Sequence, residues 1–183
     1  VQTLKSNQKT SQTSIEIQSA RELIGLGLLK EAERMISLQL KKTPRDAQWR
    51  YLNAVVLAEF AIINQNNDSQ NLPSSKSQID KAIESFERLT EEFPELSEPY
   101  NNLSVLYLMR GQPNRARDAL EKAIINNPNY ELAYENLGDL YTLLAKVTYK
   151  KGLAKLPKSL RLDKKFNHLS KMPFISKPNI IIK

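Results

Sequence analysis

The chain has 183 residues, of which 40% are hydrophobic and 7% aromatic, which is enough for one domain with its own core. Its apolar runs are far shorter than the roughly 20 residues that cross a bilayer, so we expect no membrane span. The absence of cysteine excludes disulfides and thiolate metal sites. The net charge of +7 is unevenly placed. Residues 150–183 carry ten Lys or Arg and one acid, whereas residues 1–149 carry seventeen Lys or Arg and nineteen acids.

The chain opens with a polar segment and then turns amphipathic. Residues 1–12 are rich in Gln, Ser, Thr and Lys without an apolar period, so we predict a disordered leader. Two amphipathic segments follow, with Gly27 between them and Pro44 after the second. This pattern predicts a first helix-turn-helix unit at 13–46.

The second unit, 47–96, is interrupted by a polar insertion. Its first helix is long, and Trp49, Leu52 and Val56 mark its apolar face. A polar run without periodicity follows at 64–78, which we interpret as a loop inserted between the two helices of the unit. The apolar pattern of a second helix then resumes in the expected frame.

The stretch 97–130 is the most regular in the chain. It is 34 residues long, and counted from Ser97 it has large residues at positions 4, 7 and 11 and small residues at positions 8, 20 and 27. The large residues form one face of a helix, and the small ones allow two helices to approach closely. Gly111 marks the turn and Pro128 ends the second helix. The large and small residues are, in that order, Tyr100, Leu103, Tyr107, Ser104, Ala116 and Ala123.

The fourth unit, 131–156, begins with the same pattern and then departs from it. Ala145 replaces the turn glycine and Lys150 takes the small position 20, so we expect the array to end here. Residues 157–183 follow as a predicted capping helix, up to residue 172, and a basic tail.

This arrangement resembles the tetratricopeptide repeat, a helix-turn-helix unit of 34 residues, over roughly residues 13–156. The resemblance implies an all-α fold, a right-handed superhelical solenoid of about four repeats with a C-terminal capping helix. The runs 93–107 and 133–141 are similar to bacterial members that usually carry an export signal. This implies a periplasmic or cell-envelope location, with the cytoplasm as the alternative. The sequence starts at Val1, so we expect an N-terminal piece to have been removed, either by a signal peptidase or artificially, and the periplasmic location follows in the first case.

The first helices of successive tetratricopeptide repeats line a concave groove, and the resemblance implies that positions 2, 5, 6, 9 and 12 face it. An Asn side chain there can donate to and accept from an extended peptide; alternatively, it only bonds neighbouring helices. The expected groove residues are Glu98, Asn101, Asn102, Val105, Glu135, Asn136 and Asp139, beside Leu108, Leu132 and Thr142.

Some family members bind acidic C-termini through a clamp of Lys, Asn and Arg in this groove. The clamp is absent here, because Ile17 and Arg21 stand in the first repeat and acids stand in the third and fourth. An acidic, amide-lined groove favours a neutral or basic ligand segment instead.

Enzyme chemistry has little support in the sequence. His168 is the only histidine, which excludes a three-histidine metal site and a Ser-His-Asp arrangement within one chain. No phosphate-binding glycine motif is present, so we expect no cofactor and no bound metal. The primary interpretation is therefore a non-enzymatic adaptor or scaffold that binds a protein or peptide partner in the groove.

The basic C-terminal region supports a second hypothesis, a targeting module that docks on an anionic membrane, an envelope polymer or nucleic acid. Nucleic acid is the least favoured, because the region has one arginine and no interleaved aromatic residues for base stacking. Two alternatives stay open: a merely solvated tail, and a scaffold whose catalytic part lies elsewhere in a longer protein. The candidate basic residues are Lys158, Arg161, Lys164, Lys165 and Lys171.

Overall fold

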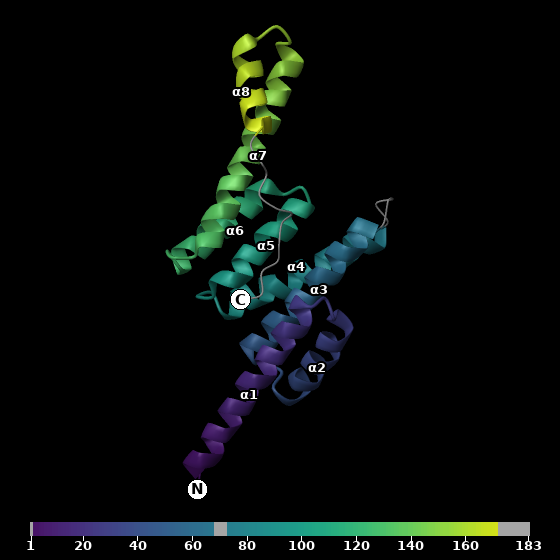
Figure 1. Cartoon of the computed structure of the whole chain (residues 1–183), viewed down its shortest axis with the longest axis vertical. Helices are drawn as coiled ribbons and strands as arrows, with labels where there is room; N and C mark the ends of the chain where they lie inside the picture. The colour runs from purple at the N-terminus through teal and green to yellow at the C-terminus, as the bar shows by residue number, and fades with distance from the viewer. Residues whose placement is uncertain (1, 68–72, 172–183) are drawn as a thin grey trace.

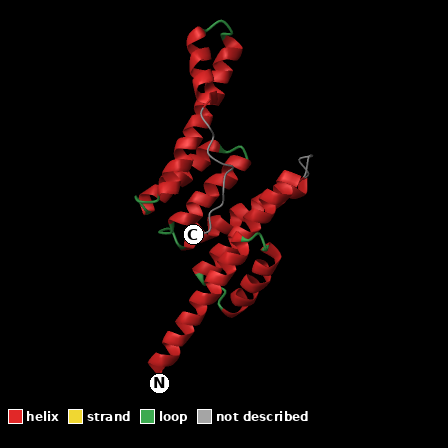
Figure 2. Cartoon of the chain, in the orientation of Figure 1, coloured by secondary structure: helices red, strands yellow, loops and turns green. Residues whose placement is uncertain are grey.

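The computed structural model describes residues 2–67 and 73–171, and within these ranges the chain is helical and has no strand (Figure 2). The expected all-α class is confirmed. The eight helices of the described ranges are α1 (Gln2–Gly25), α2 (Leu29–Lys42), α3 (Ala47–Asn67), α4 (Pro73–Glu92), α5 (Ser97–Met109), α6 (Pro113–Asn126), α7 (Glu131–Lys155) and α8 (Leu160–Lys171).

Consecutive helices form antiparallel pairs that stack along the molecule (Figure 1). Each helix contacts the next one in the chain, and α1 also contacts α3, as α3 contacts α5. Contacts of this kind, between near neighbours only, define a solenoid. We call α1, α3, α5 and α7 the first helices, and α2, α4 and α6 the second helices.

Glycine makes two of the tight turns between paired helices. Gly27 has φ 73° and Gly111 has φ 69°, a left-handed conformation that costs an L side chain energy. The N–H of Gly111 donates to the carbonyl of Leu108 (2.9 Å), and the N–H of Gln112 donates to that of Tyr107 (2.8 Å). This is the hydrogen-bond pattern of a Schellman C-cap, so these glycines end their helices as their shared position in the repeat predicts.

Small residues allow the helices of a pair to touch. Ala32, Ala82 and Ala116 occupy the same repeat position on three second helices, and each is 0% exposed. Four residues later, Ile36, Phe86 and Leu120 are also fully buried. At the alanine position the paired helices lie so close that only a methyl group fits. This close approach lets the large side chain one turn later reach the core.

The polar insertion is helical at 64–67 and 73–78, which corrects these parts of the predicted loop at 64–78; its middle, 68–72, lies outside the described residues. Helix α3 continues to Asn67 and α4 begins at Pro73, where the missing backbone N–H of proline does no harm. The side-chain Nδ2 of Asn64 donates to Oε1 of Gln78 across the pair (2.7 Å). Lack of an apolar period therefore does not exclude a helix at 64–67 or 73–78.

Residues 2–12, for which a disordered leader is predicted, are also helical. Helix α1 begins at Gln2, and its first glycine is Gly25, at its last position. The packed C-terminal half of α1 supplies the helix nucleus, and without glycine or proline upstream nothing interrupts propagation.

The fourth unit is a single helix, which corrects the predicted two-helix repeat at 131–156. With Ala145 at the turn position, α7 continues to Lys155. No second helix of its own repeat covers its N-terminal half, so Tyr134 and Tyr141 are 51% and 47% exposed, although their repeat equivalents in α5 are half-buried or buried. Gly138, at the small position, has open space around it for the same reason.

Helix α8 pairs with the C-terminal half of α7 and so extends the array rather than covering it. The helix begins at Leu160, three residues later than the predicted capping segment, after a turn at 156–159. Leu162 packs on Gly152, where its Cδ1 lies 3.0 Å from the place a Cβ would take. Residue 172 and the predicted tail beyond it lie outside the described residues.

Alanine substitution at two glycines should change stability in opposite directions. Gly111→Ala should lower the free energy of unfolding by about 1 kcal/mol, because a side chain is strained at positive φ. Gly138→Ala should raise it by about 0.5–1 kcal/mol, because this helical glycine has no neighbour within 4 Å of an added Cβ. Urea denaturation followed by circular dichroism measures both changes, and equal signs would contradict this assignment.

Overpacking at the alanine position gives a second stability prediction. Ala116→Leu should destabilise the fold by about 1–3 kcal/mol, because three added carbons must displace α5 from α6. Ala154→Leu is the matched control, since Ala154 is exposed on α7 and the same change there should be nearly neutral. Similar melting temperatures for the two variants would show that the repeat frame is wrong.

Candidate functional site

The first helices form one side of the array, which we call the inner face and define by Arg21, Tyr51, Glu98, Asn101 and Asn136. In a solenoid, successive first helices line the concave surface. All the groove residues expected from the sequence lie on α5 or α7. The side chains of Leu108, Leu132 and Thr142 are half-buried there.

Three of the expected groove residues are not open to solvent. Val105 is 2% exposed and belongs to the apolar core, which corrects its assignment to the groove surface. Asn101 and Asn102 are 0% exposed. Repeat position indicates the direction of a side chain but not its depth, and here neighbouring helices leave these residues no contact with water.

The buried amides link the first helices to one another. Nδ2 of Asn102 donates to the Oη of Tyr51 on α3 (3.1 Å), and Nδ2 of Asn136 on α7 donates to Oδ1 of Asn101 (2.8 Å). Helix α5 is thus bonded through side chains to both neighbouring first helices. These contacts fit the structural role that the sequence left open for asparagine.

Each buried amide of α5 nevertheless has an atom without a hydrogen bond. Among the described residues, Nδ2 of Asn101, Oδ1 of Asn102 and Nη1 of Arg21 are buried without a partner. All three belong to first helices, and a buried polar atom of this kind costs about 1–3 kcal/mol. Two donors and one acceptor on the inner face therefore lack partners.

A cavity of about 280 Å³ opens on the inner face between α1, α3 and α5. Its polar lining residues are Arg21, Gln48, Tyr51 and Glu98, and Pro99 is among the apolar ones. Burial raises the pKa of Tyr51 to about 12, although the hydrogen bond from Asn102 opposes this shift. The phenol of Tyr51 therefore stays protonated at physiological pH.

The three acidic groove residues have no ion-pair partner within the described chain. Glu135 is exposed, and Glu98 and Asp139 are half-buried. Carboxylates that are not neutralised by neighbours leave a negative field on this side of α5 and α7.

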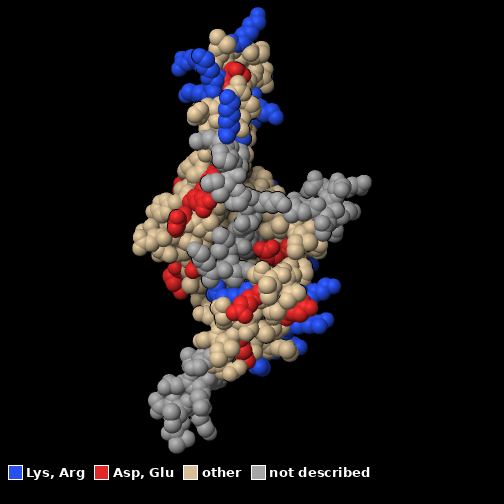
Figure 3. Space-filling model, in the orientation of Figure 1, with Lys and Arg blue, Asp and Glu red and all other residues tan. Residues whose placement is uncertain are grey.

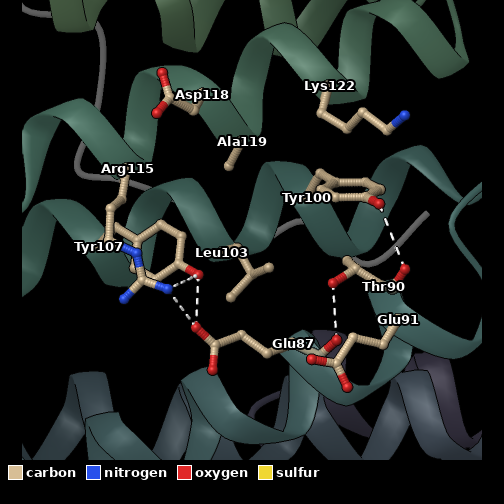
Figure 4. Close-up of a pocket in the computed structure, with 10 residues that line it drawn as sticks. All are labelled: Glu87, Thr90, Glu91, Tyr100, Leu103, Tyr107, Arg115, Asp118, Ala119 and Lys122. Carbon is tan, nitrogen blue, oxygen red and sulfur yellow. Dashed lines mark hydrogen bonds and ion pairs between the residues drawn. The ribbon is translucent and has the colours of Figure 1, made fainter.

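A second cavity, of about 480 Å³, lies between α4, α5 and α6 (Figure 4). Oε1 of Glu87 accepts hydrogen bonds from Oη of Tyr107 (2.8 Å) and Nη2 of Arg115 (2.6 Å), and the guanidinium lies 4.2 Å from the Tyr107 ring centroid. Burial and the bond to Glu87 raise the pKa of Tyr107. This closed network needs no ligand to complete it.

The five candidate basic residues lie apart from the inner face, on α8 and the turn before it (Figure 3). All five are exposed. Nζ of Lys165 is 5.7 Å from the ring centroid of Tyr149 on α7, so this side chain lies along the helix pair. The structure thus separates the two candidate surfaces.

Sequence reasoning missed Tyr51 as part of the inner face and Glu87 with Arg115 as an ion pair. No motif marks these residues, because their partners come from other repeats. Arg21 had a partial signal, since it occupies position 9 of the first repeat.

The part of the chain described by the structure holds no group of three or more His, Cys, Asp or Glu side chains arranged to bind a metal. Within the same residues, no helix is both long and apolar enough to cross a membrane.

Known structures with the same architecture are tetratricopeptide proteins. A thermophilic TPR protein in Thermus thermophilus superposes with a TM-score of 0.62 and 18% identity, covering 86% of this chain and 80% of that one. The MamA protein superposes with a TM-score of 0.53 and 20% identity, covering 87% and 81%. At these identities the likeness establishes the fold.

Sequence comparison gives a weaker link of the same kind. No family model matches the chain. The photosystem I assembly protein Ycf3 of Synechococcus sp. (strain CC9605) is 28% identical over 75 residues, which is 39% of this chain and 43% of that protein, so the match spans less than half of the relative. The stacked helix pairs and these likenesses identify the chain as a protein with the tetratricopeptide-repeat fold.

Proposed function

We propose that the chain is a non-enzymatic scaffold that binds an extended segment of a partner protein across its inner face. The observation that carries the proposal is the set of unpartnered buried atoms on Arg21, Asn101 and Asn102. A site that keeps unsatisfied donors and acceptors in the free protein gains their hydrogen bonds when a ligand arrives.

A peptide backbone has the groups that these atoms lack. An extended segment presents N–H donors and C=O acceptors along its edge. Oδ1 of Asn102 could accept from a backbone N–H, and Nδ2 of Asn101 could donate to a backbone carbonyl. Both atoms are covered in the free protein, so the proposal requires the side chains above them to move aside when the segment binds. Because both contacts are to backbone, they favour an extended ligand without requiring a particular sequence.

Charge narrows the class of ligand. Glu98, Glu135 and Asp139 carry negative charge that no described residue pairs with, so a neutral or basic segment is favoured over an acidic one. Arg21 adds a donor at the α1 end of the face, where a carbonyl or side-chain oxygen of the ligand can bind.

The proposal is tested with peptides selected from a displayed random library against the full chain. Enriched peptides should be rich in Lys or Arg and should bind about tenfold more weakly to the variant Glu135→Lys/Asp139→Lys, because two attractive charges become repulsive. Asp118→Lys/Glu121→Lys on α6 is the control with the same change in net charge, and it should bind normally. Equal weakening by both pairs would contradict an inner-face site.

Asn101→Leu separates a binding role from a structural one. The change removes a buried atom without a partner and leaves Asn136, which is half-buried, able to bond water, so stability should change by less than about 1 kcal/mol. Affinity for a selected peptide should fall about five- to tenfold, as one lost hydrogen bond implies. A large loss of stability with unchanged affinity would assign Asn101 to the fold alone.

A further inference from the structure

The paired half of α7 and α8 form a hairpin at the end of the array, which we call the basic hairpin and define as residues 146–171. Helix α8 packs against α7, and none of its residues is buried. In Figure 1 the hairpin extends beyond α6, at the opposite end from α1. A hairpin placed in this way can contact a surface without moving the stacked repeats.

The charge of α7 changes sign where the hairpin begins. Residues 131–145 have three acids and no base, whereas residues 150–171 have eight Lys or Arg and one acid, Asp163. Blue side chains accordingly gather over α8 in Figure 3. The eight basic residues, all exposed, are Lys150, Lys151, Lys155, Lys158, Arg161, Lys164, Lys165 and Lys171.

Fold stability does not account for this charge. None of the eight forms an ion pair with a described residue, and Asp163 accepts instead from Asn167 (3.0 Å). Lysines near the end of α7 suit the helix dipole, but Lys158 and Arg161 stand at the beginning of α8, where positive charge is unfavourable. An anionic partner gives these residues a favourable role.

The tip of the hairpin adds apolar surface to the charge. Leu156 and Leu160 flank the turn and are 60% and 74% exposed, and Pro157 between them is exposed as well. Lys155, Lys158 and Arg161 are their neighbours in the chain. Exposed leucines surrounded by basic side chains supply the two terms of peripheral membrane binding, apolar insertion and attraction to acidic headgroups.

We propose that the tip of the basic hairpin docks on an anionic lipid bilayer. Leu156 and Leu160 enter the headgroup region, and Lys158 and Arg161 lie against lipid phosphates. Nucleic acid or another soluble polyanion can pair with the basic side chains, but it has no apolar region in which the leucine side chains become buried. The proposal is independent of the inner face, which on α7 involves only residues before the hairpin and stays open to its own ligand.

The test is sedimentation of the full chain with vesicles. The chain should bind phosphatidylcholine vesicles that contain phosphatidylglycerol, bind pure phosphatidylcholine hardly at all, and release when salt shortens the Debye length to about 8 Å. Lys158→Gln/Arg161→Gln/Lys164→Gln should lower the partition coefficient roughly 100-fold, and Leu156→Ser/Leu160→Ser about tenfold or more.

Matched leucines elsewhere provide the control. Leu26 and Leu38 are 74% and 58% exposed on the α1–α2 pair, so Leu26→Ser/Leu38→Ser removes the same apolar area far from the hairpin. This variant should bind vesicles like the wild type, and circular dichroism should show all three variants folded. Absence of binding to the anionic vesicles would overturn the proposal. The proposal would also be overturned by a second pattern of results. In it, Leu156→Ser/Leu160→Ser leaves vesicle binding intact, while the three charge substitutions remove binding both to vesicles and to duplex DNA.

Discussion

Close approach of paired helices is the constraint on which the structure depends. A single methyl group at Ala32, Ala82 and Ala116 lets each second helix lie against its first helix, and each of these residues is 0% exposed. Once the helices are this near, polar side chains between first helices are cut off from water and must find partners across the array. Asn102 and Asn101 do so in opposite directions from α5, which fixes the spacing of the first helices.

The array ends where that constraint is no longer met. Helix α7 has Ala145 in place of the turn glycine and Lys150 in place of the small residue, so it neither turns nor accepts a second helix along its first half. The chain turns only after Lys155, and α8 then packs beside the exposed, lysine-rich half of α7. Loss of two residue types thus produces both the end of the solenoid and the basic hairpin.

Periodicity predicted the fold well because it reports which side chains share a face. It placed the turn glycines and the buried alanines of three repeats, and it gave the class of the whole chain. It failed for 2–12 and for 64–67 and 73–78, because a segment without an apolar period can still be helical. For Val105 it predicted the direction of the side chain but not its burial. It could not predict the hydrogen bond between Asn102 and Tyr51, because these residues belong to different repeats. The periplasmic location stays a prediction, since no contact in the structure bears on it.

Charge divides the molecule into two surfaces that attract different partners. Acids on the inner face favour a basic segment, and that segment is repelled by the hairpin, whose eight Lys and Arg at 150–171 form no ion pair with a described residue and favour an anion. An anionic bilayer is in turn repelled by Glu135 and Asp139, which lie on the same helix as the hairpin's lysines. For the two proposed partners, the change of sign midway along α7 would prevent competition. On the two proposals made above, one helix that carries both charges would hold a bound protein segment near a membrane surface.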